Sequence, residues 1–243
     1  MVNKIDTGIC GLNEMLNGGI PEKEIVVVIG PTGSGKTIMS LQFLYSNLQA
    51  GRNCFYISSM HDENILKKNS LQYGWDLQSF IDQGLLNLQM IEPFKMETHV
   101  LESHLISDYL DKLPKSIRDH KVDILIIDSI SDFMMLCNTE IERRGRLLSM
   151  FQEIRSNKST AFITAESELV ESEDTRGGVL KNLADGLIRL QRIQSDDFSE
   201  IIHVIQIVKM RWMKHSRSIR QYDITEKGIE VHSTYSVSMM LGR

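Results

Sequence analysis

The chain has 243 residues, of which 42% are hydrophobic and 24% are charged, so it is long enough and apolar enough to bury a substantial core. This composition excludes a disordered or fibrous protein, and the low content of glycine and proline, 16 and 4 residues, favours helices and buried strands over a loop-rich scaffold. The formal net charge of −5 argues against a surface that coats nucleic acid, although a local basic patch stays open.

The cysteines and the apolar runs bear on where the protein works. Three cysteines lie far apart without paired spacing, which predicts neither a disulfide framework nor a zinc cluster and fits a reducing, cytoplasmic setting: Cys10, Cys54 and Cys137. The longest apolar runs, 25–29 and 124–127, fall far short of the roughly 18 residues of a membrane-spanning helix. The first six residues carry no apolar stretch of signal-peptide length, so we expect no export.

From the N-terminus onward, short β-branched runs alternate with longer helical patterns. Strands are predicted over 25–29, 54–58, 86–91, 124–127 and 161–164, and helices over 38–48, 65–73, 99–113 and 141–154. This alternation indicates an α/β fold with a mostly parallel central sheet and helices on both faces. Two apolar stripes are predicted to face the core, Leu101, Leu105, Tyr109 and Leu113, and Leu147, Met150, Phe151 and Ile154.

After Asp185 the pattern changes to closely spaced strands separated by polar turns. These strands are predicted over 186–193, 201–209, 218–224 and 229–232, and they indicate an antiparallel C-terminal extension of the sheet. No internal repeat or flexible linker divides the chain. We therefore expect a single domain over 1–243 with a short C-terminal tail at about 233–243.

A glycine-rich segment follows the first predicted strand directly and opens a helix, which is the context that a Walker A phosphate loop requires. Its residues are Gly30, Pro31, Thr32, Gly33, Ser34, Gly35, Lys36 and Thr37. The glycines allow backbone N–H groups to surround phosphate oxygens, and the helix N-terminus adds partial positive charge. Lys36 is expected to reach the β and γ phosphates, and the hydroxyl of Thr37 to bind Mg²⁺.

A carboxylate is expected opposite this loop, at the end of another buried strand. Asp128 follows the apolar run 124–127, so it is predicted at the carboxyl end of a central strand, where it would hold the Mg²⁺ through water as a Walker B residue. Asp123, at the other end of the same run, is predicted to begin the strand from the solvent side.

Several motifs in order make the chain resemble a KaiC-like ATPase of the RecA superfamily over about residues 5 to 231. They are Thr7-Gly8-Ile9, Gly18-Gly19-Ile20-Pro21, the phosphate loop, Leu41 to Tyr45, Tyr73-Gly74-Trp75-Asp76-Leu77, Ile127-Asp128-Ser129, Ala184-Asp185-Gly186 and Lys209-Met210-Arg211. The resemblance implies a RecA-like P-loop fold with one KaiC-type nucleotide-binding domain. It also implies ATP and Mg²⁺ as ligands and a homo-oligomer, as a hexamer with nucleotide between neighbouring subunits.

The same resemblance gives a role to Lys209 and Arg211, which look like the family's Lys-x-Arg pair that reaches the γ-phosphate of the next protomer. Two cations two residues apart on a strand share one face, while Met210 points to the other. Lys214, Arg217 and Arg220 extend this basic strip. Two alternatives stay open for the strip: a solvated hairpin edge that discourages strand pairing, and a nucleic-acid footprint.

One motif departs from the resemblance. KaiC-like enzymes carry a pair of glutamates after the second strand, one of which is thought to activate the attacking water, and here Met60-His61 occupies that position. Asp62 and Glu63 follow it and are displaced by one or two positions. Either one of them moves in, or His61 substitutes, or His61 is an ordinary loop residue and the water has no good general base. We therefore expect tight ATP binding with slow or negligible hydrolysis.

Other residues carry alternatives of their own. Glu166, after the strand 161–164, either senses the γ-phosphate or caps the following loop, and the acidic loop 167–178 is a candidate for movement with nucleotide state. The mixed charges of Glu140, Glu142, Arg143, Arg144 and Arg146 are typical of a solvated helix face.

Three functions are compatible with these patterns. The leading hypothesis is an ATP-binding oligomerisation or regulatory switch, with a regulatory protein as a further partner. The second is a fully active RecA-family ATPase, which requires Asp62 or Glu63 to reach the water. The third is a recombinase-like DNA-binding protein, against which the acidic loop 167–178 argues, so that no nucleic-acid partner is expected.

Overall fold

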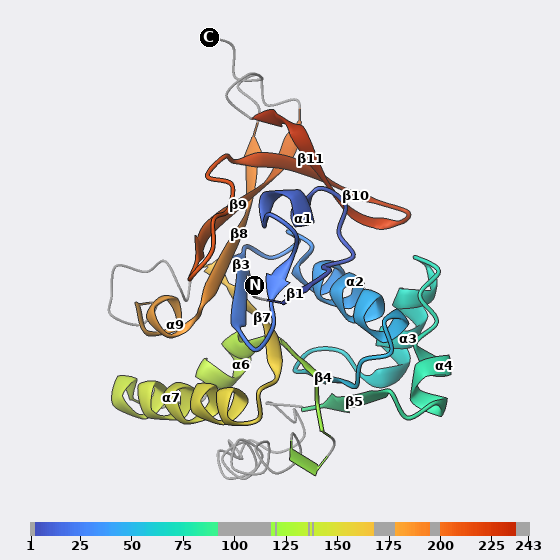
Figure 1. The fold of residues 1–243 in the computed structure, drawn as a ribbon, viewed down its shortest axis with the longest axis vertical. Helices are drawn as coiled ribbons and strands as arrows, with labels where there is room; N and C mark the ends of the chain where they lie inside the picture. Colours follow the sequence, from blue (N-terminus) through green and yellow to red (C-terminus); the bar gives the residue numbers. More distant parts are fainter. Residues whose placement is uncertain are drawn as a thin grey trace, which may run out of the picture.

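The computed structural model describes residues 3–91, 118–119, 121–135, 137, 139–167, 178–194 and 200–236, and its main element is a nine-stranded sheet (Figure 1). The strand order is β11-β10-β9-β8-β3-β7-β6-β4-β5. The strands are β3 (Ile25–Gly30), β4 (Cys54–Ser58), β5 (Leu86–Met90), β6 (Ile124–Asp128), β7 (Thr160–Glu166), β8 (Gly186–Gln194), β9 (Ile201–Met210), β10 (Arg220–Thr225) and β11 (Gly228–Ser236).

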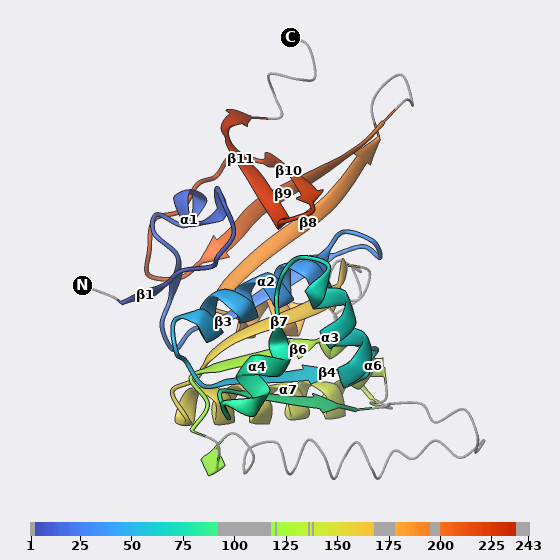
Figure 2. The ribbon, with the colours of Figure 1, turned by 90° about the vertical axis from the view of Figure 1, so that its right-hand side faces the viewer.

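The sheet has a parallel part and an antiparallel part. The strands β8, β3, β7, β6, β4 and β5 are parallel neighbours, whereas β9, β10 and β11 continue the sheet beyond β8 in antiparallel pairing. Figure 2 shows this antiparallel part rising beyond the parallel layer. The α/β fold with a mostly parallel sheet and an antiparallel C-terminal extension is thereby confirmed. A separate two-stranded antiparallel sheet joins β1 (Lys4–Ile5) and β2 (Ile20–Pro21).

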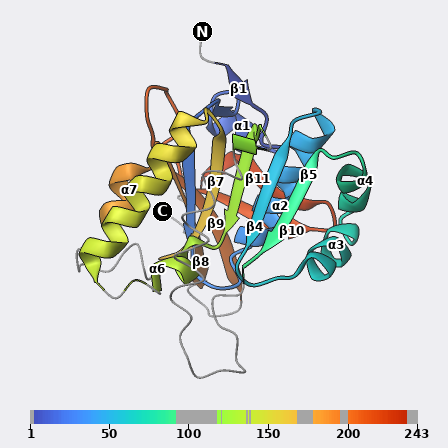
Figure 3. The same cartoon turned by 90° about the horizontal axis from the view of Figure 1, so that it is seen from below.

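Helices cover both faces of the parallel part, as predicted (Figure 3). One face carries α2 (Lys36–Gln49), α3 (Glu63–Leu71) and α4 (Leu77–Asp82), with α1 (Leu12–Met15) packed nearer the antiparallel strands. The other face carries α6 (Ile130–Met135), α7 (Glu140–Ser156) and α9 (Gly178–Leu183).

The alternation of side chains along β3 explains the two cores. Val26 and Val28 pack into the core under α2, while Val27 and Ile29 pack into the core under α6, α7 and α9. All four are fully buried because both faces of this central parallel strand are covered. The predicted stripe of α7 also lies in the second core, with Leu147, Met150, Phe151 and Ile154 all buried.

The structure differs from the predicted elements mainly in short segments. The helices α1, α4, α6 and α9 have four to six residues, too few for the helical period to stand out in the sequence, and none was predicted. The strand β11 runs to Ser236, four residues beyond the predicted end, and thus into the expected tail. The predicted helix 99–113 with its apolar stripe and most of the loop 167–178 lie outside the described residues. None of the helices that the structure describes is long and apolar enough to cross a membrane.

Candidate nucleotide-binding site

The phosphate loop joins β3 to α2 at the carboxyl edge of the parallel strands. Gly33 and Gly35 have φ angles of 78° and 83°, in the left-handed region that favours glycine. A Cβ added at Gly30 would lie 2.5 Å from Oγ of Ser34, so a side chain there would collide with the loop itself. No side chain caps the N-terminus of α2, which leaves its first backbone N–H groups available to an anion.

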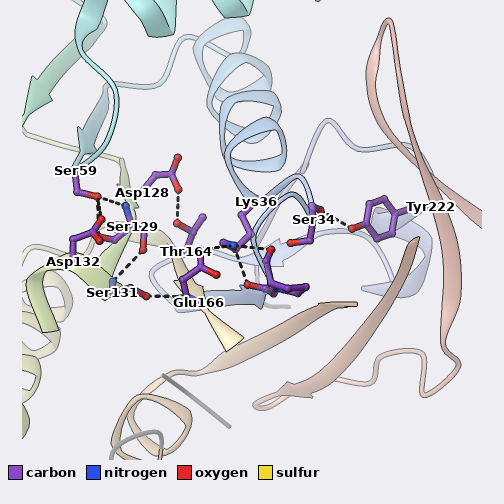
Figure 4. A network of polar contacts seen from close by, with 12 residues as sticks. Ser34, Lys36, Ser59, Asp128, Ser129, Ser131, Asp132, Thr164, Glu166 and Tyr222 are labelled. Carbon is purple, nitrogen blue, oxygen red and sulfur yellow. Dashed lines mark hydrogen bonds and ion pairs between the residues drawn. The ribbon is translucent and has the colours of Figure 1, made fainter. Parts of the chain in front are cut away.

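Lys36 begins α2 and is held at the loop by three oxygens (Figure 4). Its Nζ donates to the carbonyl oxygens of Gly30 at 2.9 Å and Pro31 at 3.0 Å, and it pairs with Oε1 of Glu166 at 2.8 Å. The Lys36 side chain is only 8% exposed, so this contact is shielded from water, whereas that of Glu166 is 34% exposed. Glu166 is itself positioned by its backbone N–H, which donates to Oγ of Ser131 at 2.8 Å.

Asp128 ends β6 on the same edge of the sheet and is buried. Its carboxylate accepts hydrogen bonds from the hydroxyls of Tyr56, at 2.8 Å, and Thr164, at 2.5 Å. Ser40 of α2 contacts the Tyr56 hydroxyl at 3.1 Å and donates to the carbonyl of Thr37. Burial and then the charge of Asp128 raise the pKa of Tyr56 well above its usual range, so its phenol remains a donor. These contacts link Asp128 to the first turn of α2.

The residues fit a nucleotide phosphate chain and a magnesium ion. Oγ of Ser34 is buried within the loop and has no hydrogen-bond partner among the described residues, while its carbonyl accepts from the hydroxyl of Tyr222 at 2.6 Å. Both groups that hydrogen-bond Asp128 are neutral hydroxyls, so its negative charge is not compensated by an ion pair within the described ranges. Thr37 is half-buried at the second position of α2. A hydroxyl and a carboxylate are the oxygen ligands that Mg²⁺ prefers.

The three residues that were candidates to activate water are engaged in local structure. Asp62 is the N-cap of α3, where Oδ1 accepts from the backbone N–H of Ile65 at 2.8 Å. Glu63 pairs with Lys67 one turn along α3, at 2.8 Å, on a largely exposed surface. His61 is half-buried, and its backbone N–H donates to Oγ of Ser58 at 2.9 Å. The described contacts of Asp62 and Glu63 thus lie within α3 and do not bring either carboxylate to the position of Met60-His61.

Lys209 and Arg211 lie at the amino ends of the parallel strands, at the opposite edge of the sheet from the phosphate loop, which follows the carboxyl end of β3. Lys209 is near the end of β9, and its Nζ donates to the carbonyl of Lys181 at 2.6 Å. Arg211 follows the last strand residue and donates to the carbonyl of Asn182 at 2.8 Å. Both cations thus face the end of α9, while Met210 packs into the core under α2, as the strand alternation predicts. Burial and then the charge of Arg211 lower the pKa of Lys209.

A cluster of charges that the sequence did not predict surrounds Arg211. Asp185, buried before β8, pairs with Arg155 at 3.0 Å and with Arg211 at 3.3 Å, and it accepts from the backbone N–H of Ile25. Burial, the hydrogen bond that protonated Glu24 donates to Asp185 and the charge of Asp185 raise the pKa of Glu24 to about 7, against the opposing charges of Arg155 and Arg211.

Other predicted residues have plain structural roles. Asp123 lies at the exposed start of β6, where its carboxylate accepts from the backbone N–H of Asn53 at 2.9 Å. Arg146 pairs with Glu142 one turn away on α7, and Arg144 is exposed, as expected for a solvated helix face, whereas Arg143 is half-buried and donates to the carbonyl of Met134 at 3.0 Å. Arg220 is half-buried within β10, so it does not belong to the exposed part of the basic strip.

The loop after β3, the carboxylate after β6 and the strand order together define a P-loop protein of the α/β class. A family model described as "ATPase: KaiC" matches residues 5–236. The chain therefore belongs to the KaiC ATPase family.

Relatives and a solved structure agree with this family. The chain is 29% identical to the UPF0273 protein PF1931 of Pyrococcus furiosus, over 96% of this chain and 95% of the relative. It is 30% identical to a UPF0273 protein of Aeropyrum pernix, over 96% and 94% respectively. It also resembles the circadian clock protein KaiC3 of Synechocystis at 25% identity, but it spans only 46% of that protein. The crystal structure of the KaiC-like protein PH0186 from Pyrococcus horikoshii shares the fold, with a TM-score of 0.81 and 24% identity over 96% of this chain and 100% of that chain.

Proposed function

We propose that this chain binds ATP with Mg²⁺ between the subunits of a homo-oligomer, as a hexameric ring, and that the bound nucleotide acts as an oligomerisation or regulatory switch in the cytoplasm. The backbone of the phosphate loop and Lys36 would bind the phosphates. Thr37 and Asp128 would hold the magnesium ion, which neutralises phosphate charge when it is bound. Family membership supports ATP as the nucleotide.

The observation that carries this proposal is the separation of Lys36 from Lys209 and Arg211. The loop follows the carboxyl end of β3, whereas antiparallel β9 ends beside the start of β8, at the other edge. Six residues of β3 at about 3.3 Å each put roughly 20 Å between the two edges. Lys209 and Arg211 are therefore too far from the phosphate loop of their own subunit to contact a nucleotide bound there. A head-to-tail neighbour would bring the two edges together, and such contacts form a ring where the rotation between neighbours closes.

Charged and apolar side chains at the two edges bear on such a contact. The partly exposed carboxylates of Asp62, Glu63 and Glu166 lie at the loop edge, while Lys209 and Arg211 lie at the other edge, where Asp185 already pairs with Arg211. Each edge also presents a large exposed apolar side chain, since Met60 is 68% exposed and Trp212 is 88% exposed. Exposed apolar side chains on facing edges, with Lys209 brought toward these carboxylates, would favour association of two copies.

The engagement of Asp62 and Glu63 supports slow hydrolysis. Moving Asp62 toward the attacking water would leave α3 without its N-cap, and Glu63 points along α3 toward Lys67. Without a general base, hydrolysis would be slower by about 10² to 10⁴ than in an enzyme that has one, while the loop could still bind nucleotide.

Light scattering after size-exclusion chromatography tests the switch. We expect the wild-type chain to form a larger species with Mg-ATP than without it, and the Lys36→Ala variant to show no such shift. Arg211→Ala should assemble less, whereas Arg144→Ala, which removes an exposed arginine of α7, should assemble like the wild type. An unchanged mass of the wild-type chain in the presence of Mg-ATP would contradict the proposal.

A further inference from the structure

Arg192, in the last part of β8, lies level with the phosphate loop. In the parallel pairing of β3 with β8, Ile29 is opposite Arg189, so Arg192 is three residues further in the direction in which the loop leaves β3. Leu190 packs into the core under α2, and a Cβ added at Gly30 would lie 3.0 Å from its Cβ. Because side chains alternate along a strand, Arg192 shares the face of Leu190, on the side of α2 and the loop.

The guanidinium of Arg192 reaches the tip of the loop. A Cβ added at Gly33 would make an ordinary van der Waals contact, 3.6 Å, with Nη1 of Arg192, so the guanidinium lies beside this part of the loop. The side chain of Arg192 is nevertheless exposed. A cation thus stands at the surface of the phosphate loop without belonging to the Walker A sequence.

Two side chains that the charge of Arg192 influences lie beside it. Its neighbour across the β8–β9 pairing is His203, whose pKa is lowered by burial and then by the charge of Arg192. The same charge opposes the upward shift that burial gives the pKa of Tyr222, the residue whose hydroxyl donates to the carbonyl of Ser34. Arg192 therefore lies near Tyr222, which contacts the loop, and near His203, whose ring packs 5.3 Å from that of Tyr222.

The loop's own lysine and Arg192 differ in how their charge is balanced. The ammonium of Lys36 is already paired with Glu166 and bonded to two carbonyls. Within the described ranges the structure records no ion pair for Arg192. Arg192 is consequently the cation at this edge whose charge is available to an incoming anion.

From this geometry we propose that Arg192 is a second phosphate-binding cation, which contacts the phosphate chain of a nucleoside triphosphate held by the loop of its own subunit. The inference rests on the proposed function, because it assigns a further residue to the same nucleotide site. A guanidinium suits this role since its planar fork can donate two parallel hydrogen bonds to one phosphate group. Arg192 contacts the nucleotide bound by its own subunit, whereas Lys209 and Arg211 would contact the nucleotide bound by a neighbouring subunit.

Calorimetric titration with Mg-ATP tests the assignment with three variants. Hydrogen bonds between charged groups are stronger than those between neutral ones, so we expect Arg192→Gln to weaken binding at least about tenfold. Arg192→Lys keeps the charge but loses the fork, and its affinity should lie between those of Arg192→Gln and the wild type. Arg144→Gln removes the same charge from exposed α7 and should leave the affinity within twofold of the wild-type value.

The outcomes separate this inference from the proposed function. If the wild-type chain binds Mg-ATP and Arg192→Gln binds it within twofold as tightly, the assignment of Arg192 is wrong and the nucleotide site stands. If the wild-type chain binds no Mg-ATP, the proposed function fails and the assignment fails with it. Equal midpoints of thermal unfolding for the wild type and Arg192→Gln are expected because this side chain is exposed.

Discussion

The ion pair between Lys36 and Glu166 predicts that a single neutralising substitution strengthens nucleotide binding. A triphosphate bound at the loop must share the Lys36 ammonium with a carboxylate that is 2.8 Å from it. Two unit charges 4 Å apart interact by about 4 kcal/mol at an effective dielectric constant of 20. The Glu166 side chain is 34% exposed, so solvent screening reduces its repulsion of the phosphates to roughly 1–2 kcal/mol. Glu166→Gln should therefore bind ATP about ten times more tightly.

Displacement of a fluorescent nucleotide measures this change directly. The gain should be largest with a chelator present, because magnesium neutralises part of the phosphate charge that Glu166 repels. Glu166→Asp is the matched control, since it keeps the carboxylate and should show affinity close to that of the wild type. Weaker binding by Glu166→Gln than by the wild type would show that Glu166 supports the bound nucleotide instead of competing with it, and would refute this reasoning.

Three further predictions concern the metal site, hydrolysis and pH. Tyr56→Phe removes one of two hydroxyls that hydrogen-bond buried Asp128 and should lower the free energy of unfolding in urea by about 1–3 kcal/mol; no change would show that this contact is dispensable. His61→Glu should raise the slow rate of phosphate release, and a fast wild-type rate that Lys36→Ala abolishes would contradict slow hydrolysis. The pKa of Glu24 is raised in the folded protein from its ordinary value of 4.5 to about 7, so its protonated form stabilises the fold at low pH, and this contribution is lost as pH rises through about 7. Because Glu24 is partly exposed, the loss should be about 1 kcal/mol, and Glu24→Gln should flatten the dependence of unfolding free energy on pH between 5 and 8; an equally steep dependence in the variant would exclude Glu24 as its source.

The parallel strands and the phosphate loop were predictable because their signals are local. The run 54–58 has the same bounds as β4, and the loop motif stands between a strand and a helix as its chemistry demands. Asp128 lies at the same edge of the sheet as Lys36 because the carboxyl ends of parallel strands lie together, which is a general property of such sheets.

The polar contacts of the site could not be predicted, because they join residues far apart in sequence through strand register. Tyr56 is 72 residues from Asp128, and Tyr222 is 188 residues from Ser34. Arg192 reaches the loop only because β8 pairs with β3, a neighbour relation that the hydrophobic pattern does not reveal. Asp62 was a candidate catalytic base in the sequence, but in the structure its side chain caps the N-terminus of α3.

Magnesium-dependent binding of a purine triphosphate at the loop is the central claim, and one calorimetric comparison tests it most directly. The wild-type chain should bind ATP more tightly with magnesium than with a chelator, Lys36→Ala should lose binding, and Asp128→Asn should bind alike with and without the metal. Absence of heat from every purine triphosphate tried with the wild-type chain, or full affinity in Lys36→Ala, would contradict the account.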